Sequence, residues 1–306
     1  MKSQETLREG LVLRLDGKGV LLDVEGREVK AWLRGRIFEK ADRREKRPIA
    51  VGDRVRLREE GEEAVVVEVL PRRTTLCRLS PEGEKKQVVA ANVDQAAVVS
   101  ALRKPEPYPP LLDRILAGAG AEDIRPILIF NKLDLDRKGS ARKWEEIYAP
   151  TGFPILFTSV PQKTGLEELK SRLRDKTTVF AGPSGAGKSS LLNAVQPGLR
   201  LKTGEVGRKG VHPGRHTTSS AMLLKLSFGG YVVDTPGVRT FTTWGIQRKE
   251  LARLFPEFEP YLGKCAFHDC SHTHEPGCAL REAVERGRIP PTRYRSYCSI
   301  LDELPE

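Results

Sequence analysis

One octapeptide constrains this chain more than any other stretch: residues 182–189 match the pattern G-x-x-x-x-G-K-[ST]. An apolar run at 178–181 precedes it and a helical pattern at 190–195 follows it, which is the strand, loop and helix order of a phosphate-binding P-loop. In such a loop, backbone N–H groups and the helix N-terminus hold the phosphates, so we expect Lys188 to reach the β- and γ-phosphates and Ser189 to hold Mg²⁺. The predicted phosphate-binding residues are Gly182, Pro183, Ser184, Gly185, Ala186, Gly187, Lys188 and Ser189.

Length and composition indicate a folded protein with more than one domain. The 306 residues are 39% hydrophobic and 30% charged, which is enough for two or three domains with sizeable cores. No apolar run approaches the roughly 20 residues of a membrane span, and the N-terminus lacks a signal-peptide core, so we expect a cytoplasmic protein without a membrane partner. The net charge of +11 favours a polyanionic partner in addition to a nucleotide, although basicity also serves solubility.

Residues 1–75 predict a small β-barrel of the OB type, because about five short alternating runs are separated by turns. The expected strands are 10–15, 19–24, 28–33, 53–57 and 64–70. The basic segment 34–47 lies beside Trp32 and Phe38, a combination that stacks on bases and neutralises phosphates in barrels that bind RNA. Acidic residues interrupt the segment, so a solvated charge run remains the alternative.

A second domain is predicted to follow a linker at 76–92, which contains Pro81 and Gly83. From residue 93 to 244, strands alternate with helices, which indicates an α/β domain with a parallel sheet. The apolar strand 126–130 leads directly into Asn131-Lys132-Leu133-Asp134. This Asn-Lys-x-Asp sequence is similar to the guanine-reading motif of GTPases.

In that interpretation the Asp134 carboxylate accepts hydrogen bonds from the N1–H and the exocyclic amine of guanine. Adenine offers no donors at those positions, so a buried unpaired carboxylate would reject it. Ser159, in the sequence Thr158-Ser159-Val160, resembles the loop that closes over guanine, with Val160 in place of the usual alanine.

Two segments after the P-loop helix resemble the switches of a GTPase. Residues 202–218 are basic and glycine-rich, and either Thr217 or Thr218 fits the switch I threonine whose hydroxyl reaches Mg²⁺. The strand 231–233 ends in Asp234-Thr235-Pro236-Gly237, an Asp-x-x-Gly element that corresponds to switch II, with Asp234 on the Mg²⁺ side.

The order of these elements is unusual, since the guanine motif precedes the P-loop. Termini in compact domains are often close together, so the chain can be joined there and cut elsewhere without loss of the sheet. The sequence therefore predicts a circularly permuted GTPase domain whose cut falls just after Gly237.

The C-terminal part, 245–306, is predicted to be mainly helical and to bind a metal. Three of the five cysteines lie between 265 and 278, in the pattern C-x₄-C-x-H-x₅-C, and three thiolates with one imidazole can close a structural zinc site. The expected zinc ligands are Cys265, Cys270, His272 and Cys278; possible substitutes are His268, His274 and Cys298. The basic residues on the last helices are candidates for phosphate contacts or for solvated faces: Arg281, Arg286, Arg288, Arg293 and Arg295.

Together, a basic barrel, a permuted GTPase and a C-x₄-C-x-H-x₅-C finger resemble the RsgA (YjeQ/YloQ) family over nearly the whole chain. The resemblance implies a GTPase that binds the 30S ribosomal subunit late in its maturation, contacts 16S rRNA and is stimulated by the ribosome. It carries the GTP-binding role onto Ser190 as well, and places the family's switch I signature at Gly214-Arg215-His216-Thr217-Thr218. The implied cofactors are Mg²⁺ with GTP and one structural Zn²⁺.

The catalytic residues are predicted to be Lys188 and His216. Val238 stands where Ras-type enzymes carry the glutamine that orients water, and an aliphatic side chain cannot do so. His216 is the nearest polar candidate, an assignment that rests largely on the resemblance; packing of the loop or contact with an rRNA phosphate are the alternatives.

An alternative function is a GTP-gated switch that binds RNA or protein and whose hydrolysis only resets the cycle. An ATP-driven RNA-remodelling enzyme is disfavoured by the guanine motif. We expect a monomer.

Overall fold

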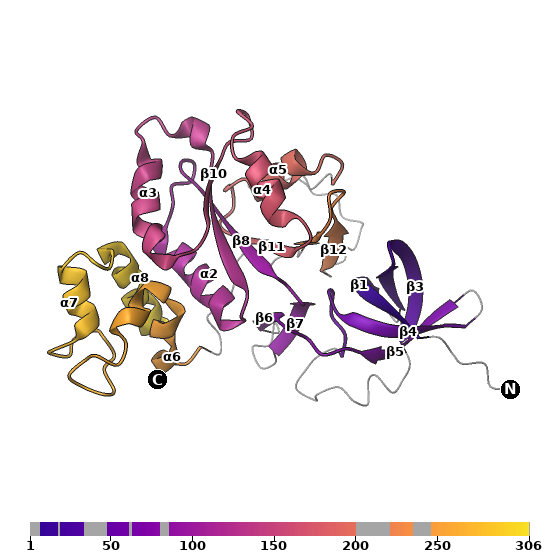
Figure 1. Ribbon diagram of the computed structural model, residues 1–306, viewed down its shortest axis with the longest axis horizontal. Helices are drawn as coiled ribbons and strands as arrows, with labels where there is room; N and C mark the ends of the chain where they lie inside the picture. The colour runs from indigo at the N-terminus through magenta and orange to yellow at the C-terminus, as the bar shows by residue number, and fades with distance from the viewer. Residues whose placement is uncertain are drawn as a thin grey trace, which may run out of the picture. The chain divides into compact units, whose positions relative to one another are not determined.

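Figure 1 shows the computed structural model of the chain. The structure describes residues 7–17, 19–33, 48–60, 63–79, 86–199, 221–234 and 246–305. It divides into two compact units: the first comprises Met1–Gln95, Leu173–Val179 and Lys209–Val238, and the second comprises Ala96–Arg172, Phe180–Arg208 and Arg239–Glu306. Within the described ranges, no helix is both long and apolar enough to span a membrane.

The first unit contains the predicted barrel. Its strands are β1 (Arg8–Asp16), β2 (Gly19–Val24), β3 (Arg27–Leu33), β4 (Arg54–Glu60) and β5 (Glu63–Val69). β2 pairs antiparallel with β1 and β3, β4 pairs antiparallel with β1 and β5, and β3 runs parallel to β5. Because each strand has two neighbours in the barrel, the sheet closes on itself and confirms the OB-type prediction.

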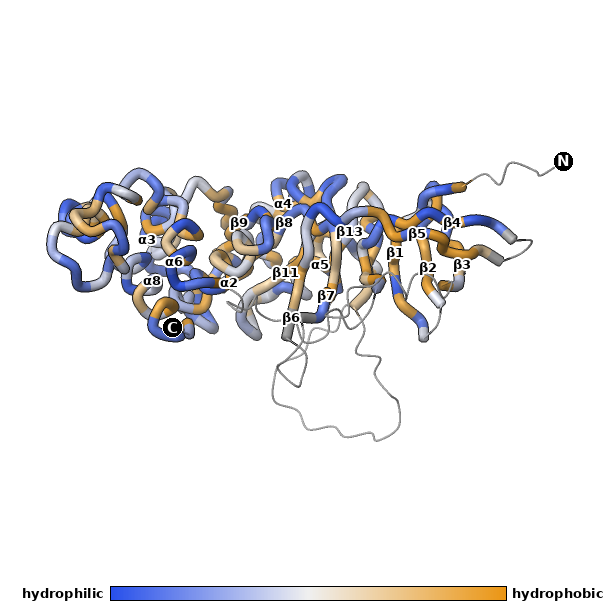
Figure 2. The backbone as a smooth tube through the Cα atoms, turned by 90° about the horizontal axis from the view of Figure 1, so that it is seen from below, coloured by the Kyte–Doolittle hydropathy of each residue, from blue (hydrophilic) through white to orange (hydrophobic). Residues whose placement is uncertain are grey.

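Alternating apolar side chains fill the barrel, and Figure 2 shows the hydrophobic stretches along β1 and β2. The buried core residues are Val12, Val20, Leu22, Val24, Ala31, Ile49, Val55, Leu57, Ala64 and Val66. Bulges between Val12 and Arg14 and between Arg56 and Leu57 bend the strands. This bending helps a sheet of only five strands to close into a barrel. Trp32 is 49% exposed, whereas the basic segment 34–47, with Phe38, lies outside the described residues.

The stretch 76–92, predicted as a linker, forms a β-hairpin instead of an irregular connection. Its antiparallel strands are β6 (Thr75–Leu79) and β7 (Lys86–Ala91). Polar side chains fasten both ends of the segment to the barrel: Arg72 Nε lies 2.8 Å from a carboxylate oxygen of fully buried Asp53, and Asn92 Nδ2 donates to the Gly52 carbonyl at 2.9 Å. The domain boundaries themselves remain a prediction.

A second hairpin in the first unit is joined to the barrel. Its strands are β12 (Met222–Lys225) and β13 (Tyr231–Asp234), and β13 runs parallel to β11 (Thr177–Ala181). β12 pairs with β1, and the buried Asp23 of β2 adds a polar attachment. Its Oδ2 accepts hydrogen bonds from Lys225 Nζ at 2.7 Å and from the Tyr231 hydroxyl at 2.8 Å. These bonds favour the ionised form and lower the pKa of Asp23 although burial opposes the shift.

The second unit contains the alternating strands and helices expected of the α/β domain. They are β8 (Gln95–Ala101), α2 (Pro109–Ala121), β9 (Arg125–Asn131), η1 (Leu133–Leu135), α3 (Ser140–Tyr148), η2 (Ala149–Thr151), β10 (Ile155–Thr158), α4 (Leu166–Leu173) and α5 (Lys188–Val195). These three strands are neighbours in the sheet in the order β10-β9-β8, and β10 runs parallel to β9. Every residue of β8 is buried, and so is every residue of β9 after the first, as in parallel sheets covered on both faces.

The C-terminal part of the second unit is helical, as predicted. It consists of α6 (Arg248–Leu251), η3 (Ala252–Leu254), η4 (Pro256–Tyr261), α7 (Ala279–Glu285) and α8 (Pro291–Glu303). Stacked Phe255 and Phe258, with ring centroids 4.9 Å apart, pack edge-on against Tyr297 of α8. These three buried rings form the centre of its core.

Arg293 departs from the sequence-based expectation, which placed it on a solvated face or against phosphate. Its side chain is 1% exposed and forms ion pairs with Asp113 of α2 and Glu257 of η4. Two buried carboxylates therefore hold this arginine in the interior. Arg286, Arg288 and Arg295 are exposed, so both interpretations remain open for them.

Candidate nucleotide and metal sites

The octapeptide forms the predicted loop between β11 and α5. Gly182 has φ 129°, and a Cβ there would lie 2.0 Å from the carbonyl oxygen of Val99. Gly187 has φ 96°, and a Cβ there would lie 2.3 Å from Nδ2 of Asn131. Both positions combine a left-handed backbone with a close approach, which only glycine permits.

Lys188 is the first residue of α5, and its ammonium lies over the loop. Nζ donates hydrogen bonds to the carbonyl oxygens of Gly182 at 2.8 Å and Pro183 at 2.9 Å. The side chain therefore bends back across the loop to the side where bound phosphates would lie.

Asn131 connects three segments that are distant in the sequence. Its Nδ2 donates to the carbonyl oxygen of Ala186 at 2.9 Å, across 55 residues of chain. Its Oδ1 accepts a hydrogen bond from Thr158 Oγ1 at 3.1 Å. One buried amide thus places the guanine motif, the P-loop and the end of β10 together.

The two predicted base-contacting residues also meet. Ser159 Oγ donates to Asp134 Oδ1 at 2.6 Å, which fixes the carboxylate at the end of the guanine motif. The structure therefore brings Asn131, Asp134 and Ser159 into one cluster beside the P-loop.

Sequence reasoning missed the loop after β8. Lys132 has a left-handed backbone, with φ 63°, and its Nζ donates to the carbonyl oxygen of Lys104. Burial lowers the pKa of Lys132. On the same loop, Pro105 Cδ lies 3.5 Å from a Cβ built on Gly185, so this loop borders both the P-loop and the guanine motif. Only the Pro105 turn signal marked it in the sequence.

Asp234 ends strand β13 in the first unit, where burial raises the pKa of its carboxyl. The remaining switch residues lie outside the described ranges, namely His216, Thr217, Thr218, Gly237 and Val238.

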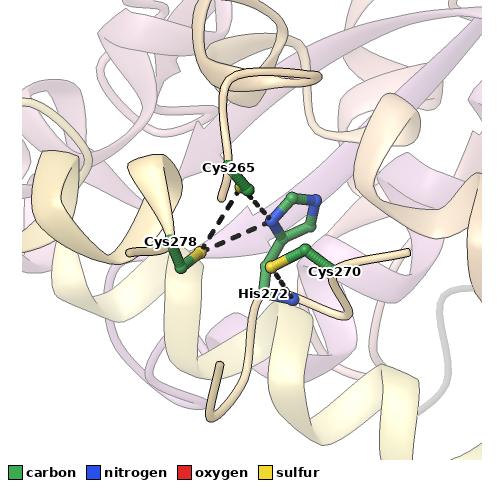
Figure 3. Close-up of side chains that lie close together, drawn as sticks. All are labelled: Cys265, Cys270, His272 and Cys278. Atoms are coloured by element: carbon green, nitrogen blue, oxygen red, sulfur yellow. Dashed lines mark hydrogen bonds between the residues drawn. The ribbon is translucent and has the colours of Figure 1, made fainter. Parts of the chain in front are cut away.

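Four predicted metal ligands form one cluster in the C-terminal region, and Figure 3 shows their sulfur and nitrogen atoms turned toward one another. The cluster consists of Cys265, Cys270, His272 and Cys278, whose potential ligand atoms all lie within 4.8 Å of one another. His272 Nδ1 is 3.4 Å from Cys265 Sγ and 3.5 Å from Cys278 Sγ, and these two sulfurs are 3.9 Å apart.

These separations fit a tetrahedral zinc ion. With Zn–S bonds of about 2.3 Å and a Zn–N bond of about 2.0 Å, the edges of a tetrahedron are about 3.8 Å between sulfurs and about 3.5 Å between sulfur and nitrogen. Burial raises the pKa of Cys270 to about 12 and lowers that of His272; a bound cation would favour the thiolate and the neutral imidazole needed for coordination. The three candidate substitutes, His268, His274 and Cys298, are not part of the cluster.

Comparison with known proteins gives one family over most of the chain. The family model described as RsgA GTPase matches residues 69–244. The small ribosomal subunit biogenesis GTPase RsgA of Moorella thermoacetica is 43% identical over 302 residues, which cover 97% of each chain. The protein of the same name from Gemmatimonas aurantiaca is 42% identical over 285 residues, or 92% of each chain.

Two solved structures share the whole fold. YjeQ from Thermotoga maritima has a TM-score of 0.79 and 34% identity, with 98% of this chain and 99% of that chain covered. YloQ, described as a circularly permuted GTPase, has a TM-score of 0.76 and 30% identity, with 100% of this chain and 99% of that chain covered.

Proposed function

The chain belongs to the RsgA family of circularly permuted GTPases, and we propose that it hydrolyses GTP in the biogenesis of the small ribosomal subunit. The observation that carries this proposal is the buried Asn131 amide, which joins the guanine motif to the P-loop although the two stand in permuted order. A P-loop alone would fit many nucleotides; the attached Asp134 makes the site selective for guanine.

Different groups of the chain bind different parts of the nucleotide. Backbone N–H groups of the P-loop and Lys188 hold the β- and γ-phosphates, Asp134 binds the N1–H and exocyclic amine of guanine, and Ser159 keeps that carboxylate in place. The hydroxyl of Ser189 and the carboxylate of Asp234 are the oxygen donors that suit Mg²⁺, with a threonine of switch I, Thr217 or Thr218. When bound, Mg²⁺ neutralises charge on the transferred phosphoryl group.

His216 is proposed to orient the attacking water. Val238 cannot do so, and His216, whose imidazole stands next to the paired threonines in the sequence, is the nearest polar side chain that can align water with the γ-phosphate. This assignment requires slow intrinsic hydrolysis and stimulation by 30S subunits, which would hold switch I over the nucleotide.

The polyanionic partner is proposed to be the 30S subunit, through 16S rRNA. Exposed Trp32 is the penultimate residue of β3, two positions before the basic segment 34–47, and an aromatic ring near basic side chains suits single-stranded RNA. We further propose that the protein acts as a monomer in the cytoplasm, and that one zinc ion held by the Cys₃His cluster stabilises the C-terminal part.

The test is GTP turnover of the wild type and of His216→Ala, each measured with and without 30S subunits. We expect the wild type to be stimulated by the subunit, and the variant to lose the stimulated rate while it keeps GTP affinity and GTP-dependent binding to the subunit. A wild type that binds 30S subunits only in its GTP state, with turnover that they leave unchanged, would favour a GTP-gated switch. Near-normal stimulation of the variant, or loss of its binding to the subunit, would refute the role of His216.

A further inference from the structure

The carboxylate of Glu275 lies at the centre of the loop that carries the metal ligands. Oε1 accepts hydrogen bonds from the Ser271 backbone N–H at 2.7 Å and from the Ser271 hydroxyl at 2.5 Å. Oε2 accepts from the backbone N–H groups of Thr273 at 3.1 Å and His274 at 3.2 Å. The bonded residues flank His272 on both sides, so one side chain holds the backbone around a ligand.

The carbonyl groups of the same loop are held by helix α8. The hydroxyl of Tyr294 donates to the carbonyl oxygen of His272 at 2.8 Å, and that of Tyr297 donates to the carbonyl oxygen of Ser271 at 2.8 Å. Arg281 Nη1 donates to the carbonyl oxygen of Glu275 at 3.3 Å. The N–H groups of the short loop are therefore bonded to the Glu275 carboxylate, and its carbonyl groups are bonded to side chains of α7 and α8.

This arrangement fixes a conformation that the chain would not adopt by itself. His272 has φ 62°, a left-handed backbone that is uncommon for a residue with a side chain, and it is this turn that directs Nδ1 toward Cys265 and Cys278. Its own N–H donates to Cys270 Sγ at 3.4 Å. Without acceptors for the N–H groups of Ser271 and Thr273, the turn would have to be stabilised by metal binding itself.

We infer that Glu275 is a positioning residue for the metal: it holds the loop in the ligating conformation and thereby raises the affinity of the Cys₃His cluster for zinc. It does not belong to the ligand set, and it contacts the cluster through the Cys270 sulfur at 3.5 Å. Groups that orient metal ligands typically contribute 10- to 100-fold in affinity, and a carboxylate with four accepted bonds should lie in that range. The inference rests on the proposed zinc site.

Charge and hydrogen bonding make opposite predictions for Glu275→Gln. A carboxylate near a thiolate opposes its negative charge, so if Glu275 acted only as a charge, the neutral amide would strengthen zinc binding. If Glu275 acts as a hydrogen-bond acceptor, the amide replaces one of the two accepting oxygens by an NH₂ group that faces N–H or O–H donors. The loop then loses hydrogen bonds on that side, and zinc binding weakens.

The experiment measures zinc affinity of the full-length protein by competition with a chromophoric chelator, and records the visible ligand-field spectrum after substitution with Co²⁺. The variants are Glu275→Gln and Glu275→Ala, with Glu285→Ala, an exposed position at the end of α7, as the control. GTP affinity is measured alongside, because a general loss of folding would reduce it too.

We expect both Glu275 variants to bind zinc about 10- to 100-fold more weakly and to show an altered Co²⁺ spectrum, with GTP affinity and the control unchanged. A Glu275→Gln variant that binds zinc as tightly as the wild type, or more tightly, overturns the inference even if Glu275→Ala does not fold. If the wild type itself binds no zinc, the zinc proposal fails instead.

Discussion

Replacing Arg293 by methionine should destabilise the C-terminal part of the second unit more than any change at its surface. The side chains of Arg293, Asp113 and Glu257 are 1%, 0% and 2% exposed, so their interactions are hardly screened by solvent. The guanidinium carbon also lies 4.6 Å from the ring centroid of Phe255 and 5.3 Å from that of Tyr148. Methionine would fill similar space but would leave two carboxylates buried without their cation.

Removing one partner of a buried ion pair lowers the free energy of unfolding by about 3–5 kcal/mol, and we expect the loss for Arg293→Met to fall in this range. This loss of stability should depend on pH. Burial raises the pKa of Asp113 even with Arg293 beside it, and removal of the arginine raises it further. A group whose folded-state pKa is raised loses stability as the pH rises through that pKa, so the deficit should be smallest at acidic pH and grow toward neutrality.

The assay is hydrogen exchange followed peptide by peptide over α2 and α8, because it gives a local opening free energy even where the whole chain does not unfold in one step. Arg286→Met is the matched control: that side chain is 66% exposed and its ion pair with Glu282 should contribute no more than about 0.5 kcal/mol. Asp113→Asn added to Arg293→Met should recover part of the loss, since it removes a buried charge and keeps an acceptor for the Tyr148 hydroxyl. The reasoning would be refuted if Arg293→Met lowered the local opening free energy by less than about 1 kcal/mol, or if the double variant regained none of the lost free energy.

Three further predictions concern the nucleotide site and the barrel. Asp134→Asn should lose its preference for guanosine over xanthosine nucleotides in competition binding; an unchanged preference would show that the guanine motif is misassigned. Gly182→Ala should reduce GTP affinity by at least about 10-fold, because its Cβ would lie 2.0 Å from the Val99 carbonyl oxygen, whereas Gly139→Ala, in open space with φ 65°, should leave affinity unchanged. Asp23→Asn should reduce the stability of the first unit at neutral pH by about 1–2 kcal/mol, a small figure because Lys225 is half exposed. Since the pKa of Asp23 is lowered in the folded protein, this difference should vanish as the pH falls through that value, and a pH-independent difference would contradict the ion pair.

Motifs whose residues are close together in the chain were predictable from the sequence. The P-loop, the Asn-Lys-x-Asp motif and the C-x₄-C-x-H-x₅-C pattern each need particular side chains at fixed short spacings, and the backbone between them is too short to vary much. The barrel was predictable for a related reason, because each strand repeats its apolar residues with a period of two. The roles of these motifs could therefore be proposed from the sequence, but their positions in space relative to one another could not.

Only the tertiary structure decided which distant groups meet. Asn131 and Ala186 each lie in a predicted motif, but no sequence pattern says that the two residues are bonded to each other across 55 residues. Nor does any pattern say that the loop at Lys104 reaches the guanine motif. The hairpin at 76–92 was hidden because its strands are only five and six residues long and the Pro81 and Gly83 signals between them are also typical of a linker.

Arg293 shows the physical reason most clearly. In the sequence it is one of several arginines on amphipathic helices, and nothing local separates it from its exposed neighbours. Its burial is possible because a carboxylate arrives from 36 residues away and another from 180 residues away. A charge enters a protein interior only where its counter-charge is already placed, and that placement is a property of the packed chain.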